Sequence, residues 1–345
     1  MATDTVIREL RAYLDDIAAA DAFSGAVLIA KGDEPLFTGA YGLASKGFGI
    51  PNTVETKFNL GSMNKMFTAV AIAQLVERGR LAFTDPIAAH LPDYPREIAA
   101  TVTVHHLLTH TSGLGSYWTD RFEETKARVR TVRDYFPLFV DEPLAFTPGE
   151  RFGYSNVGFI VLGAIVERAS GQDYFDYVRA HVYAPAGMAD TDAYELDRDV
   201  PGLAVGYTHQ RIDGVQELEV WRNNLLLHVS KGGPAGGGYS TIGDLLRFAT
   251  ALRRHTLLAP PTTEIVLAGK VDTDVAPGVR YGYGFMDATL KGLRVVGHSG
   301  GFPGISAHLD MYPEHGYTVA VLSNYDPPSG FKVTDKAREL IAATV

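Results

Sequence analysis

Apolar residues near the start of the chain recur every three or four positions. Charged residues separate them in MATDTVIRELRAYLDDIAAADAF, where the apolar positions are Ile7, Leu10, Leu14 and Ile17. This spacing predicts an amphipathic helix on the surface of the fold. Two β-rich runs follow, SGAVLIA at 24–30 and LFTGAYGLA at 36–44, on either side of a Gly/Asp/Pro turn. These runs predict a β-hairpin.

Two later segments have the apolar character of buried helices. Residues 62–78 carry apolar side chains around nearly the whole helical circumference, and Gly79 follows as a C-cap, so we expect a central helix there. The run VGFIVLGAIV at 157–166 is too short to cross a membrane and predicts a second buried helix. Elsewhere between residues 85 and 230, helical patterns alternate with loops marked by proline and glycine.

The C-terminal part of the chain is rich in strand patterns. Four runs separated by turn signals predict strands: YGYGFMDATL (281–290), LRVVGHSG (293–300), GISAHLDMY (304–312) and YTVAVLSN (317–324). Helices are predicted at 243–254 and 333–344. Since strands come from both ends and helices from the middle, we expect one domain over 1–345. It would have an α/β lobe from 1–58 and 235–345 and an inserted, mainly helical lobe from 59–234.

Composition limits the classes of partner and the kinds of chemistry that are expected of this chain. The chain has 345 residues, a net charge of −9, no cysteine and no basic run, which argues against nucleic acid and anionic membrane as partners. Disulfides, thiolate metal sites and cysteine nucleophiles are excluded. The N-terminus shows no signal-peptide pattern, so a cytoplasmic protein is expected. The oligomeric state is not indicated.

The string GHSGG at 297–301 matches the G-x-S-x-G pattern of a nucleophile elbow, with Ser299 as the nucleophile. An elbow serine lies between a strand and a helix, but Pro303 and Gly304 oppose a helix and another strand pattern follows. Asp310 and His315 could serve as the acid and the histidine of a triad, but only their order in the chain supports that assignment. We therefore expect the match to be accidental.

Ser62-Met63-Asn64-Lys65 forms an S-x-x-K motif at the predicted start of the central helix. Positions i and i+3 share a helix face, and a buried lysine tends to lose its proton, so Lys65 can activate the Ser62 hydroxyl. The alternative role for Ser62 is that of an ordinary helix N-cap. A second S-x-x-K, Ser329 to Lys332, lies in what we expect to be a loop flanked by proline and glycine.

Two further motifs follow in order. Tyr154-Ser155-Asn156 is the one Y-x-N among 17 tyrosines, and His298-Ser299-Gly300 is the one H-x-G among 11 histidines. With S-x-x-K ahead of them, the chain resembles the serine β-lactamase and penicillin-binding-protein-like superfamily. Within it, the class C β-lactamase branch, which includes the family VIII carboxylesterases, is the most similar. The resemblance extends to LLTHTSGL (107–114) and to the segments 146–167, 237–248 and 297–324.

The resemblance implies an α+β fold of the β-lactamase/transpeptidase type, with an antiparallel sheet flanked by the N- and C-terminal helices. It also implies roles for the motif residues. Ser62 would be the acylated nucleophile, Lys65 its principal base and Tyr154 a proton shuttle. Asn156 would hold Lys65 and the substrate. The backbone N–H groups of Ser62 and Gly301 would form the oxyanion hole, and the substrate would lie along His298, Ser299 and Gly300.

The third motif departs from the K-T-G of β-lactamases, since His298 and Ser299 replace lysine and threonine. Histidine is largely neutral near pH 7, so small neutral esters become the expected substrates of a serine hydrolase of carboxylesterase type. A β-lactamase, a DD-peptidase and a D-amino-acid amidase remain alternatives on the same fold. A binding protein without catalytic activity is a third possibility. The presence of all three motifs argues against it, because such a protein has no need to keep them.

No metal or cofactor is expected for this chemistry. His105, His106 and His110 lack an H-E-x-x-H frame or a carboxylate partner, so we expect them to be structural. The Gly-rich segment KGGPAGGGYST (231–241) lacks the ending of a phosphate loop. It predicts closely packed backbone near the cleft. Tyr117, Trp118 and Trp221 either wall the substrate pocket or shield other residues from solvent.

Overall fold

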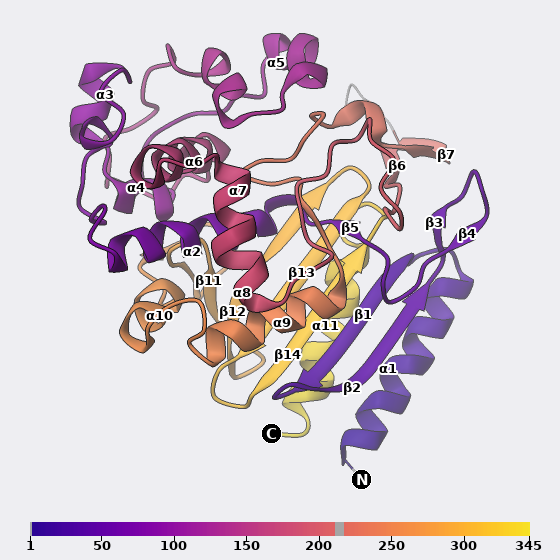
Figure 1. Cartoon of the computed structure of the whole chain (residues 1–345). Coiled ribbons are helices and arrows are strands. Elements are labelled where there is room, and N and C mark those ends of the chain that lie inside the picture. Colours follow the sequence, from indigo (N-terminus) through magenta and orange to yellow (C-terminus); the bar gives the residue numbers. More distant parts are fainter. Residues whose placement is uncertain (1, 211–216) are drawn as a thin grey trace.

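The computed structural model describes residues 2–210 and 217–345. Its centre is an antiparallel sheet in the order β2-β1-β14-β13-β12-β11-β10-β9 (Figure 1). The strands are β1 (Gly25–Lys31), β2 (Glu34–Tyr41), β9 (Val271–Asp272), β10 (Val279–Tyr281), β11 (Met286–Leu290), β12 (Leu293–Phe302), β13 (Ile305–Tyr312) and β14 (Tyr317–Ser323). Strand β1 pairs with β14 from Gly25↔Ser323 to Lys31↔Tyr317, so the two ends of the chain build one sheet. The predicted α+β fold with an antiparallel sheet is confirmed.

Helices from the two ends of the chain cover one face of this sheet. Helix α1 (Ala2–Ala19) and helix α11 (Ser329–Ala342) pack against each other and against the strands. The valines of β14 that face these helices pack against the apolar stripe of α1. This layer of the core, between the sheet and the two helices, includes Leu10, Leu14, Val319 and Val321. Helix α1 is amphipathic because it buries one stripe here, whereas β14 is buried on both faces and contributes Ala320 and Leu322 to the core on the other side of the sheet.

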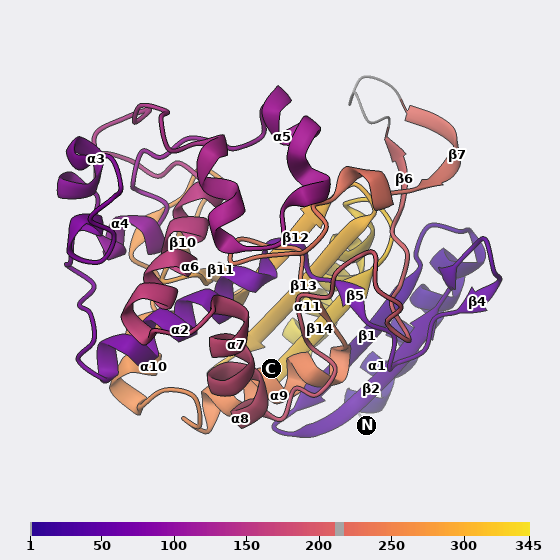
Figure 2. The ribbon, with the colours of Figure 1, turned by 45° about the horizontal axis from the view of Figure 1, so that its top comes forward.

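The opposite face of the sheet supports the helical part of the molecule (Figures 1 and 2). Helix α2 (Asn64–Glu77) runs through its middle and contacts α6 (Asn156–Ser170) and α10 (Pro260–Leu267), while α9 (Ile242–Arg253) lies on β1 and β14. Every residue of α2 from Asn64 to Leu75 is buried, as its all-round apolar pattern predicts.

Short elements complete the helical part. They are α3 (Arg96–Thr101), α4 (Val104–Leu108), α5 (Asp120–Thr125), α7 (Tyr174–Val178), α8 (Ala184–Ala186), a π-helical turn η5 (Arg179–Tyr183), and the 3₁₀ turns η1 (Gly61–Met63), η2 (Ile87–Ala89), η3 (Lys126–Arg128), η4 (Val132–Leu138) and η6 (Leu225–Leu227). Small two-stranded sheets pair β3 (Leu43–Ser45) with β4 (Ile50–Pro51), β5 (Phe58–Asn59) with β8 (Tyr239–Ser240), and β6 (Tyr207–Gln210) with β7 (Glu217–Asn223). In the described part of the chain, no helix is long and apolar enough to span a membrane.

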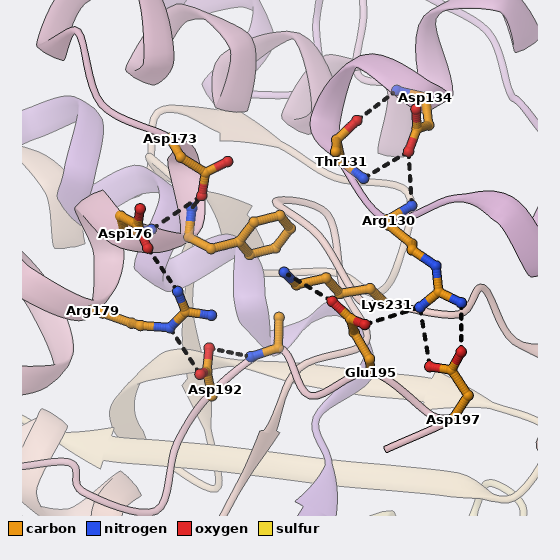
Figure 3. Close-up of polar contacts among 12 residues, drawn as sticks. Arg130, Thr131, Asp134, Asp173, Asp176, Arg179, Asp192, Glu195, Asp197 and Lys231 are labelled. Carbon is orange, nitrogen blue, oxygen red and sulfur yellow. Dashed lines mark hydrogen bonds and ion pairs between the residues drawn. The ribbon is translucent and has the colours of Figure 1, made fainter.

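Ion pairs fix the segment that leads into the Gly-rich stretch (Figure 3). Arg130 contacts Glu195 at 3.0 Å and Asp197 at 2.6 Å, and Lys231 approaches Glu195 at 3.7 Å. The Lys231 ammonium also lies 3.9 Å from the centroid of the Phe175 ring. Because exposed ion pairs contribute little stability, we attribute to this network mainly the placement of residue 231 and the glycines after it.

Three predicted boundaries were wrong. The central helix begins at Asn64 rather than 62, because the 3₁₀ turn η1 precedes it. The predicted strand 281–290 is two strands, β10 and β11, separated by a turn in which Gly284 has φ +75°. The last helix begins at Ser329 rather than 333, because Pro328 lies outside the helix, where its missing N–H costs nothing.

Candidate active site

The turn that carries Ser62 is pressed against strand β12. Gly61 has φ +50°, a conformation that glycine adopts without a steric penalty. Gly300 of β12 lies so close that a Cβ atom there would sit 1.9 Å from the carbonyl oxygen of Leu60 and 3.1 Å from the backbone nitrogen of Ser62. Gly300 is therefore what allows the third motif to approach the Ser62 turn.

Lys65 is fully buried, and its Nζ has three polar neighbours. Nζ lies 3.1 Å from Ser62 Oγ, 2.7 Å from Asn156 Oδ1 and 2.5 Å from the carbonyl oxygen of Ala235. Burial holds the pKa of Lys65 well below its usual value. A neutral amine has two hydrogens and one lone pair, and the two carbonyl-type oxygens can only accept, so they take the hydrogens. The lone pair then faces the Ser62 hydroxyl, the arrangement of a base with its nucleophile.

Tyr154 is a second polar neighbour of the Ser62 hydroxyl. Its hydroxyl hydrogen-bonds to the Ser62 side chain, and its ring lies 4.9 Å from Lys65 Nζ. The residue is 43% exposed, because one side of the ring is open while the hydroxyl end is enclosed. Burial raises the pKa of Tyr154, and the hydrogen bond with Ser62 opposes that shift only in part. The phenol is therefore neutral near pH 7 and suited to donating a proton.

The start of helix α6 presents the Y-x-N motif. Ser155 is the N-cap, and its Oγ accepts from the N–H of Gly158 at 3.3 Å. Asn156, the first helical residue, directs Oδ1 to Lys65. Three residues in a row thus supply the phenol, the helix cap and the amide.

His298 lies on β12 and is buried, with 4% of its surface exposed. Its Nδ1 donates to the carbonyl oxygen of Ser299 at 2.5 Å, and its Nε2 accepts from the Tyr281 hydroxyl at 2.8 Å. Burial, together with the nearby Lys65, lowers the pKa of His298 to about 3. The third motif therefore carries no charge at neutral pH. Both ring nitrogens of His298 therefore bind protein groups, and its predicted contact with substrate stays a prediction.

The prediction that Ser299 lines the cleft was wrong. Side chains alternate along β12, so Gly300 faces the Ser62 turn and Ser299 faces the opposite side. Its cross-strand partner His308 packs on Phe331 of α11, which marks that side as the α11 face. Gly301 follows on the same face, while its backbone nitrogen lies beside Gly61.

The elbow hypothesis also fails on geometry. Ser299 lies inside β12, and β13 follows after a turn, so no helix begins there. Asp310 is held by Arg338 at 2.7 and 3.1 Å rather than by His315, which lies in the turn after β13.

The second S-x-x-K motif lies on helix α11 rather than in a loop, which corrects our expectation. Its serine, Ser329, is buried and shares a hydrogen bond with Ser323 at 2.9 Å, whereas Lys332 is exposed to solvent. Both motifs have helical spacing, and they differ in that Lys65 is buried whereas Lys332 is exposed.

Ser62 opens into a cavity of about 100 Å³. Its walls are largely aromatic and apolar: Tyr117, Trp118, Phe122, Tyr135, Leu227, Val229, Phe302 and Ile305. Asn59, Asn156, His228 and the backbone of 235–237 and Gly301 also line it. None of the described lining residues is an Asp, Glu, Lys or Arg, and burial lowers the pKa of His228 to about 4. Two larger hollows, of about 680 and 580 Å³, contain none of the motif residues.

Trp118 and Phe302 join the two parts of the molecule across this cavity. Their rings stack with centroids 5.3 Å apart and planes 24° apart. Tyr117 stacks on Trp118 in turn, at 5.3 Å. Trp221 lies elsewhere, stacked on Tyr325 at 4.1 Å.

His105, His106 and His110, which lie between the first and second motifs, have structural partners. His106 forms a capping box with Thr103 at the start of α4, and His105 shares a hydrogen bond with the Tyr283 hydroxyl at 2.9 Å. His110 accepts from the N–H of Ser155. Within the described residues, no group of three or more His, Cys, Asp or Glu could hold a metal ion.

Three functional contacts were missed by sequence reasoning: the Ala235 carbonyl, Tyr281 and His110. The Gly-rich segment was the signal for the first, because its expected close packing places Gly236 against Gly61, where a Cβ atom would be 2.9 Å from the Gly61 oxygen. No pattern in the sequence links Tyr281 to His298.

The chain is similar to known proteins along nearly its whole length. The model of the Beta-lactamase family matches residues 5–344. Penicillin-binding protein 4* of Bacillus subtilis (strain 168) is 30% identical over 335 residues, covering 94% of this chain and 73% of that protein. Esterase EstB of Burkholderia gladioli is 32% identical over 314 residues, covering 79% of this chain and 77% of that protein.

A solved structure shares the whole architecture. The crystal structure of a penicillin-binding protein from Bacillus halodurans superposes with a TM-score of 0.84 at 33% identity, covering 99% of both chains. The matched regions therefore include every segment that contributes to the cavity around Ser62.

Proposed function

The chain belongs to the beta-lactamase family of serine hydrolases, and we propose that it is a carboxylesterase that cleaves small neutral esters through an acyl-enzyme on Ser62. The observation that carries this proposal is the uncharged, aromatic cavity beside Ser62, with the neutral His298 behind it. An uncharged lining binds the apolar groups of a neutral ester without leaving a buried charge unpaired.

In the proposed acylation, Ser62 Oγ attacks the ester carbonyl carbon as Lys65 Nζ takes the hydroxyl proton. The backbone N–H groups of Ser62 and Gly301 hold the resulting oxyanion. Tyr154 then gives its phenolic proton to the leaving alkoxy oxygen as the carbon–oxygen bond breaks, and the Lys65 ammonium returns a proton to Tyr154. In deacylation a water molecule attacks the acyl carbon while the neutral Lys65 Nζ takes its proton. The bond to Ser62 Oγ then breaks as the Lys65 ammonium protonates that oxygen, which releases the acid and restores the free enzyme.

The direction of the pKa shifts supports this division of roles. Burial favours the neutral form of both groups, so Lys65 is ready to accept a proton and Tyr154 is ready to donate one. The reverse assignment would need a phenolate in a site that disfavours charge.

The similarity to penicillin-binding proteins supports a second candidate, a hydrolase of β-lactams, D-peptides or D-amino-acid amides. Those substrates carry a carboxylate or an ammonium group, which a complementary charge would bind best. The described lining residues carry neither a positive nor a negative charge, which favours a neutral ester as the substrate.

Active-site labelling tests the nucleophile first. A fluorophosphonate is expected to give one adduct, located on Ser62 by peptide mass spectrometry, and the Ser62→Ala variant should not be labelled. An adduct on Ser299 would overturn the mechanism.

A substrate panel then tests the specificity. Hydrolysis of p-nitrophenyl esters, a chromogenic cephalosporin and D-alanyl amides should be compared by kcat/KM. We expect the best ester to exceed both other classes by about 100-fold, equivalent to about 2.7 kcal/mol of transition-state stabilisation. A larger kcat/KM for the cephalosporin or the amide would replace the esterase proposal with the second candidate.

A further inference from the structure

His110 has a backbone conformation that is unusual for its residue type. Helix α4 ends in a Schellman motif, in which the N–H of Thr111 donates to the oxygen of His106 and the N–H of His110 donates to that of Leu107. His110 occupies the left-handed position of this motif with φ +58°, where glycine is usual. The other described non-glycine residues with positive φ, namely Asp21, His255 and Lys291, are exposed, whereas His110 is completely buried.

This buried histidine holds the main chain on both sides of Tyr154. Its carbonyl oxygen accepts from the N–H of Gly153 at 2.8 Å, and its Nδ1 accepts from the N–H of Ser155 at 3.1 Å. Its ring also lies against the Tyr154 ring, with centroids 4.2 Å and planes 33° apart. One residue thus fixes the position of Tyr154 through three separate contacts.

Packing alone does not explain an imidazole at this position. Since Nδ1 accepts, the proton of the neutral ring lies on Nε2, which is buried and has no hydrogen-bond partner among the described residues. An apolar side chain would fill the same space without that unpaired donor. Burial, with a smaller contribution from the nearby Lys65 and His298, holds the pKa of His110 well below its usual value, so His110 stays neutral and is not a proton donor.

We propose that His110 is the positioning residue that keeps the Tyr154 hydroxyl on Ser62, through its hydrogen bond to Ser155 and its contact with the Tyr154 ring. This inference rests on the proposed serine-hydrolase mechanism, in which Tyr154 transfers protons. His110 is not among the residues that line the cavity, and its ring also packs on Tyr281 and Phe159, with centroids 4.6 and 5.1 Å away. Among its ring partners, Tyr154 is the one whose hydroxyl hydrogen-bonds to Ser62.

Two substitutions distinguish the role of the Nδ1 hydrogen-bond acceptor from the role of the space that the His110 side chain fills. His110→Asn keeps an acceptor near the position of Nδ1 and tolerates a positive φ, whereas His110→Leu keeps an apolar side chain without an acceptor. The readouts are kcat and KM on a p-nitrophenyl ester, the rate of Ser62 labelling by a fluorophosphonate, and the Tm. His255→Leu is the matched control, because His255 has φ +56° but is exposed and belongs to the loop after α9.

We expect H110L to lower kcat and the labelling rate by about 10- to 100-fold with little change in KM, the effect of misplacing a catalytic group by about 1 Å. H110N should recover to within about fivefold of wild type, and H255L should change kcat by less than about threefold. An H110L variant with a lower Tm but unchanged kcat would overturn the proposal.

A double-mutant cycle with Tyr154→Phe tests whether His110 acts through the phenol. In the Y154F background, H110L should cost less than about threefold, because the hydroxyl that it positions is gone. The same loss in both backgrounds would refute the positioning role. Should H110L not fold, H110N against His110→Gln decides the point, since the longer glutamine moves the acceptor away and should lose as much activity as we expect of H110L.

The labelling rate also distinguishes failure of the His110 role from failure of the proposed serine-hydrolase function. Wild-type protein that is labelled on Ser62, with H110L labelled equally fast, refutes the role of His110 alone. Wild-type protein that is not labelled on Ser62 refutes the proposed function and, with it, this inference.

Discussion

Replacing Gly300 with alanine is expected to disable the site although the side chains of Ser62, Lys65, Tyr154, Asn156 and His298 are all retained. The added Cβ would lie 1.9 Å from the carbonyl oxygen of Leu60, whereas ordinary contacts begin near 3.4 Å. Strand β12 and the Ser62 turn must therefore separate by about 1.5 Å. That movement carries the N–H of Gly301 away from the N–H of Ser62, and the two proposed oxyanion donors no longer converge.

The expected loss is about 100-fold in kcat, because removing one oxyanion donor costs about 10²–10³ and a 1 Å misplacement costs a similar factor. The overpacking should also lower the free energy of unfolding by about 1–3 kcal/mol. The assay measures kcat and KM on a p-nitrophenyl ester, together with unfolding in urea to show that the variant is folded.

The next residue provides the comparison. A Cβ on Gly301 would meet only the Pro327 ring, at 3.4 Å, and alanine keeps the backbone N–H. Gly301→Ala should therefore lower kcat by less than about threefold, and Gly47→Ala, with open space around it, serves as a remote control. If folded Gly300→Ala kept kcat within threefold of wild type, the argument from close approach would be refuted.

Three further predictions follow from the site and its surroundings. Burial lowers the pKa of Lys65 and the mechanism needs its neutral form, so kcat/KM should fall as the pH drops through that lowered pKa and stay level above it; a pH profile that rises toward acid would contradict this. Trp118→Ala removes the stack on Phe302 and should raise KM for aromatic esters by about three- to tenfold with kcat nearly constant, whereas an unchanged KM would place the substrate elsewhere. Asp310→Asn breaks a buried ion pair with Arg338 and should lower the free energy of unfolding by about 3–5 kcal/mol without slowing the labelling of Ser62, whereas a triad acid would cost about 10⁴ in kcat.

Local patterns predicted the elements well. The helical period around Leu10 survives in the structure because α1 buries one face, and the apolar run of β14 survives because that strand is buried on both faces. The errors fall at boundaries, such as the 3₁₀ turn at Ser62 and the glycine turn at Gly284, where one or two residues change direction to fit a neighbour.

The candidate site was predictable where the chemistry follows from residue type and spacing. Ser62 and Lys65 are three residues apart, so their contact follows from the helix start alone, and Asn156 belongs to a motif with a defined order. Ser299 was misplaced because a strand presents adjacent residues to opposite faces, and the sequence does not say which face meets the site.

The sequence by itself determined the helices, the strands and the motif side chains, because periodicity and residue chemistry are local properties. The all-round apolar pattern of its helix already predicted that Lys65 is buried, whereas only the tertiary structure decided that the second motif lies on helix α11 with Lys332 exposed. It also decided that the Ala235 carbonyl takes one of the Lys65 hydrogens and that His110 supports Tyr154. These contacts join residues far apart in the chain, and the protonation states that depend on them are set by burial, which exists only once the chain has folded.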